Sequence, residues 1–177
     1  MKLLARLLFR LTANRPCRLI EINGHPYLER YFIGQVLGIT VYLHRFVRDD
    51  DERHLHNHPW NHALSVVLCG RYTETQADST THASICTCRE NLIWLSQHQV
   101  RWVNYIHRND FHQITGVKPE TWTLFLHTRW KHRWGFLHRI SRDIPLYEFQ
   151  TYTSDRPREW WHTAPPGKHA RRWPFGA

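Results

Sequence analysis

The sequence predicts an all-β fold, a barrel or sandwich of short antiparallel strands that follows one amphipathic helix. Short apolar runs separated by turn residues recur from residue 17 to about residue 140, and almost no helical periodicity interrupts them. Aromatic residues make up 14% of the chain, nine of them tryptophan, and aromatic side chains favour sheets. A chain of 177 residues is long enough to bury one core, so we expect a single domain with short extensions.

The expected strands lie between residues 17 and 150, which we take as the barrel. The sequence "NGHP" at 23–26 joins two strand-like runs and is typical of a hairpin turn. We expect a buried strand over 63–70 that ends at Gly70, and a polar loop over 77–84. The other expected strands cover residues 36–47, 71–76, 85–96, 100–106, 111–115, 121–130 and 132–137.

Residues 1–15 have the pattern of an amphipathic helix. Five leucines form one stripe, and Lys2, Arg6 and Arg10 recur every four residues opposite it. The stretch is too short and too charged to cross a bilayer. A helix that lies on a membrane surface or directs targeting is one interpretation. We instead expect the stripe to pack on the barrel: Leu3, Leu4, Leu7, Leu8 and Leu11.

Positive charge is concentrated at the two ends of the chain. The formal net charge is +9, yet residues 1–20 carry five basic residues and no acid, and residues 155–177 carry five basic residues against two acids. The middle of the chain is therefore close to neutral, which argues against a nucleic-acid groove across the barrel. Residues 151–177 are rich in Pro, Arg and Trp, and predict an irregular tail whose tryptophans dock on the barrel. At most a weak membrane-surface contact is expected of the ends.

Four cysteines are too few for a disulfide framework in a chain of this length. Cys86 and Cys88 form a C-x-C pair, but no second pair accompanies it, so we do not expect a structural zinc site. Unpaired cysteines are typical of a reducing compartment, and we expect a cytoplasmic protein.

Histidines between residues 54 and 62 predict a metal site. His56 and His58 alternate, so in an extended chain both rings point to one face, and neutral imidazole is the commonest metal ligand in proteins. His112 begins a later strand-like run that an antiparallel barrel would bring alongside them. We expect these three histidines to converge on one divalent ion, and we place His82 and His138 on loops.

The order of these motifs resembles the cupin superfamily of small jelly-roll barrels. "HNHP" at 56–59, the apolar strand "ALSVVLCG" and the later "NDFHQI" match its two motifs, and the resemblance covers roughly residues 25–140. It implies a double-stranded β-helix with His56, His58 and His112 as metal ligands. The sequence departs from the pattern at Ala63, where cupins often carry a glutamate.

This departure leaves three interpretations of the metal site open. Three histidines act alone, as in thiol dioxygenases, or Glu74 is a fourth ligand, or the barrel has lost its metal. His54 or His62 is a further candidate to complete the set of ligands. Three imidazoles suit Fe(II) best, and Zn, Mn or Ni are possible.

The resemblance implies a mononuclear-iron dioxygenase or oxygenase that acts on a small polar substrate or a modified residue. A non-catalytic barrel that binds a small ligand or a metal is the first alternative. An interaction protein that uses its basic ends is the second. Members of the superfamily are often dimers, so a homodimer is also expected from the resemblance.

Overall fold

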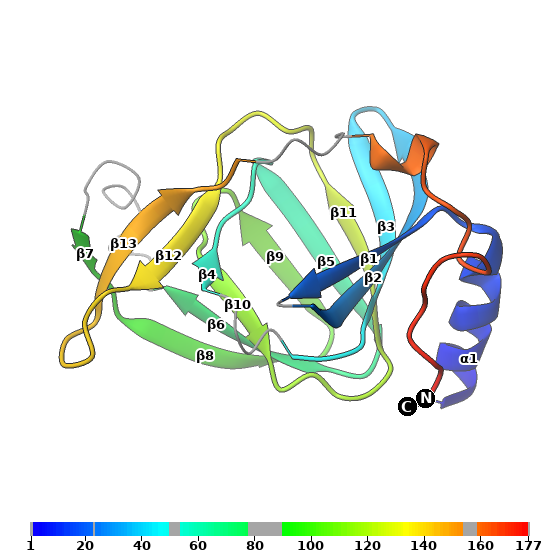
Figure 1. The fold of residues 1–177 in the computed structure, drawn as a ribbon, viewed down its shortest axis with the longest axis horizontal. Coiled ribbons are helices and arrows are strands. Elements are labelled where there is room, and N and C mark those ends of the chain that lie inside the picture. The colour runs from blue at the N-terminus through cyan, green and yellow to red at the C-terminus, as the bar shows by residue number, and fades with distance from the viewer. Residues whose placement is uncertain (1, 23, 50–53, 78–89, 154–158, 177) are drawn as a thin grey trace.

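The fold consists of two curled antiparallel sheets that face each other, with one helix at the outer end (Figure 1). This computed structural model describes residues 2–22, 24–49, 54–77, 90–153 and 159–176. In spatial order, the strands of the first sheet are β1 (Cys17–Ile22), β2 (His25–Val36), β3 (Ile39–Phe46), β11 (Thr121–His127), β5 (His62–Cys69) and β9 (Val103–His107). Those of the second are β7 (Glu90–Leu92), β13 (Leu146–Thr151), β12 (Gly135–Arg139), β4 (Leu55–His56), β10 (His112–Thr115), β6 (Tyr72–Ala77) and β8 (Leu95–Val100).

The strand order is that of a double-stranded β-helix. The central strands of the first sheet run β3-β11-β5-β9, and those of the second run β4-β10-β6-β8. Successive strands from β3 to β6 therefore alternate between the sheets, as do those from β8 to β11, which is the winding of a jelly roll built from two Greek keys. The predicted all-β fold is confirmed, and strands β1, β2, β7, β12 and β13 extend the two sheets.

Several strand boundaries differ from those expected. The expected strand over 36–47 contains the β2–β3 turn, because Leu37 and Gly38 both have positive φ angles, of 48° and 81°. The prediction that His138 lies on a loop is wrong, because His138 lies on β12. This strand ends at Arg139, two residues after the expected end of the strand over 132–137. Strand β13 was not expected. Some of the expected features lie outside the described residues: His82, the C-x-C pair, and the loop over 77–84 apart from its first residue.

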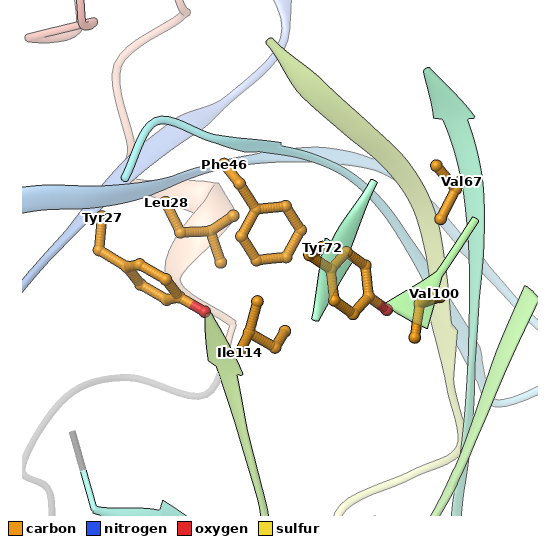
Figure 2. Close-up of a cluster of buried hydrophobic side chains, with 7 residues drawn as sticks. All are labelled: Tyr27, Leu28, Phe46, Val67, Tyr72, Val100 and Ile114. Carbon is orange, nitrogen blue, oxygen red and sulfur yellow. The ribbon is translucent and has the colours of Figure 1, made fainter. Parts of the chain in front are cut away.

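An apolar cluster fills one end of the space between the sheets (Figure 2). Leu28 and Phe46 come from the first sheet, and Tyr72 and Ile114 come from the second. The rings of Phe46 and Tyr72 lie 5.6 Å apart between centroids. Since alternate residues of a strand point to opposite faces, Arg30 and His44 also face the interior, two positions along from Leu28 and Phe46.

The helix α1 (Lys2–Leu11) packs on the outer face of the first sheet. The side of the helix that it buries is not the expected leucine stripe. Ala5 and Leu8 are its buried residues, and they contact a cluster that includes Tyr31 and Trp122. The prediction that the leucine stripe packs on the barrel is right for one leucine and wrong for four: Leu3, Leu4, Leu7 and Leu11 are exposed. The sequence pattern did not reveal that the C-terminal tail also packs against α1.

A buried ion-pair network fastens the end of the C-terminal tail to the first sheet. Arg45 points out of the barrel with 1% of its side chain exposed, and pairs with Glu29 at 3.1 Å and with Glu120 at 2.6 Å. Arg45 also donates hydrogen bonds to the backbone oxygens of Trp173 and Pro174, at 2.8 and 3.1 Å. The charges of this network therefore hold the end of the chain in place.

Further along the tail, tryptophans dock on the barrel as expected. The 3₁₀ turn Trp160–His162 brings Trp161 onto Phe32, with ring centroids 4.4 Å apart and planes within 2° of parallel. Trp160 stacks on Tyr42 at 5.9 Å. The tail thus covers both the end of the barrel and the side that carries α1.

We predict that Arg45→Met destabilises the protein by about 3–5 kcal/mol, because it removes the closer cation of the buried Glu29 and leaves Arg172 at 4.0 Å from that carboxylate. Chemical denaturation measures the loss, and hydrogen exchange of the amides of residues 172–176 reports release of the tail. Arg171→Met is the matched control, since its pair with Glu21 is exposed at 3.7 Å and such pairs contribute about 0–1 kcal/mol. Equal stability of the two variants would contradict the assigned role of Arg45.

Candidate metal centre

Three histidines converge inside the barrel. Two of them lie on the neighbouring strands β4 and β10, and the third lies in the segment between β4 and β5. His56 closes β4 and lies directly opposite His112, the first residue of β10, in the antiparallel pair. His58 follows two residues after His56 and points to the same place. The three ring centroids are 4.9–5.0 Å apart, and one nitrogen from each ring lies within 4.8 Å of the other two.

This three-histidine cluster has the donor set and the spacing that a divalent metal needs. Metal–nitrogen bonds of about 2.0–2.1 Å place the ligand atoms of one ion about 3–3.5 Å apart. Nε2 of His58 and Nε2 of His112 face each other at 2.7 Å, so small ring movements suffice to admit an ion. Burial lowers the pKa of His58 well below its ordinary value, with a further contribution from His112 and His56, so its ring is neutral and able to donate a lone pair.

Glu74, a candidate ligand, lies behind His112. Its carboxylate accepts a hydrogen bond from Nδ1 of His112, at the edge of the ring opposite the nitrogen that faces His58. Gln76 donates to the same carboxylate at 3.0 Å, and Nε2 of His98 lies 3.2 Å from it. Burial raises the pKa of Glu74, but the neighbouring His112, Asn104 and His98 together bring the pKa below its ordinary value. In the described part of the chain, the group of possible ligands contains only the three histidines.

The other two candidate histidines lie away from the cluster. His54 is exposed and packs against His138, with ring centroids 3.9 Å apart. His62 is exposed on β5, where its Nδ1 is 2.5 Å from the hydroxyl of Tyr105. The structure therefore does not bring either of them to the three nitrogens.

Sequence reasoning missed a second group of interior histidines beside the cluster. His44 and His127 face the interior from β3 and β11, and burial lowers the pKa of both, that of His127 to about 4. Nε of Arg30 donates to Nε2 of His44 at 3.0 Å. Trp60 is sandwiched between His58 and His127, with a centroid distance of 4.4 Å to each. Alternation along β3 and β11 could have shown that His44 and His127 share a face with apolar residues. Which face of each strand points inward is known only from the strand register.

A cavity of about 540 Å³ opens beside this second group. Tyr42 and His127 line it on the barrel side, and Arg129 and Trp161 are among the residues that line the rest. Because Trp60 stacks on His127 and on His58, its indole separates the cavity from the three-histidine cluster.

No family model and no curated protein matches this chain. Solved structures of similar shape include an Fe(II) form of HppE in complex with substrate, at 10% identity and a TM-score of 0.46 over 66% of this chain and 57% of that one. The others are KdgF from Halomonas sp. (10%, TM-score 0.42, 63% of this chain and 86% of that one) and a protein with a double-stranded β-helix domain from Klebsiella pneumoniae (12%, TM-score 0.43, 67% and 89%). The chain thus spans just over half the length of HppE. The strand order described above, rather than these alignments, identifies the fold as a double-stranded β-helix.

We predict that His127 makes stability fall as the pH falls from about 6.5 to about 4. Its pKa is lower in the folded protein than in the unfolded chain, so the unfolded chain binds a proton first and is favoured in that range. The shift corresponds to about 3 kcal/mol. Urea unfolding of the chelator-treated protein at several pH values measures it, and the His127→Gln variant should show a shallower pH dependence. Identical slopes for the two proteins would refute the prediction.

Proposed function

We propose that this protein is a metal-dependent enzyme with a cupin-type barrel, of the mononuclear-iron oxygenase type, which acts on a small polar substrate or a modified residue. The observation that carries the proposal is the convergence of His56, His58 and His112 in the interior. Three imidazoles could hold Fe(II), Zn, Mn or Ni, and Fe(II) bound by His56, His58 and His112 would supply redox chemistry with dioxygen.

In this proposal the protein itself orients the ligands and holds their protons. The Glu74 carboxylate keeps the proton of His112 on Nδ1, which leaves Nε2 with its lone pair directed at the metal position. The stacked ring of Trp60 fixes the plane of His58. These contacts favour Glu74 as a residue that positions His112 rather than as a fourth ligand.

A polar substrate suits the interior beside the cluster. Nε1 of Trp60 and Oγ1 of Thr123 are buried polar atoms that make no hydrogen bond with any of the described residues. Unsatisfied buried donors are costly and rare, so a polar molecule that enters this space would meet groups ready to bind it. The cavity lined by Tyr42 and His127 is the entry that we propose. Trp60 stacks on His127 and on His58, between this cavity and the three-histidine cluster.

A small-molecule substrate, a cytoplasmic setting and a homodimer complete the proposal. Cys17 and Cys69 are free and buried, and burial raises the pKa of the Cys17 thiol to about 12, so it is unreactive. Buried free thiols suit a reducing compartment. None of the described helices is both long and apolar enough to cross a membrane.

We predict that the untagged protein, reconstituted anaerobically with Fe(II), binds about one ion per chain, and that His56→Ala, His58→Ala or His112→Ala lowers this content sharply, because each removes one of three ligands. Elemental analysis after desalting measures the metal. His54→Ala and His62→Ala are the matched controls and should retain it. Full occupancy in the triple variant would show that the metal site lies elsewhere.

Nitric oxide, which binds Fe(II) in place of dioxygen, distinguishes an oxygenase from a barrel that only binds metal. Nitric oxide added to the Fe(II) protein reports an open coordination position through its paramagnetic resonance signal. An Fe(II) protein that gives this signal and consumes oxygen with candidate substrates behaves as an oxygenase. A protein that binds metal but gives no signal is the non-catalytic barrel, and that result would contradict the proposed activity.

We predict that Glu74→Gln weakens metal affinity by about 10–100-fold without abolishing binding, the usual effect of losing a carboxylate that orients a ligating histidine. A metal titration compared with that of His112→Ala measures the difference. A loss as large as that of His112→Ala would instead make Glu74 a direct ligand.

A further inference from the structure

The exposed side of α1 carries four leucines that no part of the described structure covers. We call this surface the leucine face; the exposed fractions of its members are Leu3 82%, Leu4 41%, Leu7 50% and Leu11 62%. At 100° per residue, the four side chains fall within an arc of about 100°. The barrel takes a separate arc of the helix, centred on Ala5 and Leu8. The leucines are therefore not part of the core, although their spacing is as regular as that of a core-facing stripe.

A row of basic side chains runs alongside the leucine face. Lys2, Arg6 and Arg10 are exposed and occupy the arc between the leucine face and the buried side. The chain has no acid before Glu21, so nothing on the helix offsets these charges. The tail lies beside α1 (Figure 1), and the backbone N–H of its exposed Lys168 donates to the backbone oxygen of Ala13, just past the end of the helix. This surface thus combines an apolar strip with a cationic border.

The size and charge of this surface do not suit a second copy of the chain. A helix of ten residues is about 15 Å long, and a strip about 10 Å wide along it offers about 150 Å², far below the roughly 800 Å² per partner of a stable interface. A two-fold contact would also set the basic row of one copy close to the same row of the other. An apolar strip with a row of cations along one edge is instead complementary to a bilayer with anionic headgroups.

We propose that α1 is a peripheral membrane-binding helix, which lies in the surface of an anionic bilayer with its leucine face among the acyl chains. Lys2, Arg6 and Arg10 contact the lipid phosphates, and the barrel stays in water on the opposite side of the helix. With four leucines and few charges, binding is weak and reversible. This proposal does not depend on the metal centre or on the enzyme activity.

Vesicle co-sedimentation of the full chain tests the proposal. We expect binding to phosphatidylcholine vesicles that contain phosphatidylglycerol, little binding to phosphatidylcholine alone, and loss of binding as salt screens the charges. Replacing Lys2, Arg6 and Arg10 together with Gln should lower the partition coefficient on the order of a hundredfold, at about fivefold per charge.

Two variants separate the leucine face from general stickiness. Leu3→Gln with Leu7→Gln should abolish binding and leave the melting temperature and the metal content unchanged, because both side chains are exposed and Gln is a good helix former. Leu37→Ser is the matched control, since Leu37 is 97% exposed in the β2–β3 turn, and it should bind as the wild type does.

Three results would overturn the proposal. They are no binding to anionic vesicles at low salt, equal binding by the Leu3/Leu7 variant, or a wild-type dimer in analytical ultracentrifugation that the Leu3/Leu7 variant dissociates. The last would assign the leucine face to a second copy of the chain.

Discussion

The register of β10 between β4 and β6 is the constraint on which the three-histidine cluster depends. In this register His112 lies opposite His56 of β4. On its other side His112 lies opposite Gln76 of β6, and Glu74 is two residues before Gln76 on that strand. Because side chains alternate between the faces of a strand, a slip of one residue would turn His112 out of the barrel. Ile114, which belongs to the apolar cluster, shares its face with His112, so the packing of the core and the position of the ligand are fixed together.

The same alternation organises the outer face of the first sheet. Arg45 points outward between His44 and Phe46, which point inward, and there it meets Glu29 and Glu120. A buried ion pair is not in itself a source of stability, but it accepts few geometries. By fixing the tail beside α1, this network gives the helix a second surface to pack on besides the sheet, at Phe9. Neither surface covers the leucine face.

The sequence predicts features that depend on neighbours along the chain, and misses those that depend on distant segments. Strand alternation was enough to place His56 and His58 on one face, and the turn before β10 was enough to select His112. By contrast, the side of α1 that is buried depends on a tail about 160 residues away, whose Arg172 donates to the backbone oxygen of Phe9 at 2.8 Å. The role of Glu74 likewise needed the β6–β10 register, since the sequence alone leaves the direction of its side chain open.

The interior of the barrel is layered, and the layering bears on function. An apolar cluster around Phe46 fills one end, and an aromatic cluster around Trp60 and Phe125 fills the other. The histidines lie in and beside this second cluster, where Trp60 stacks on His58 and Phe125 stacks on His44 at 4.7 Å. Burying neutral imidazoles costs free energy that a purely apolar core would avoid. This cost is confined to the end of the barrel that holds the histidines and the cavity lined by Tyr42 and His127, which is where the proposed substrate would bind.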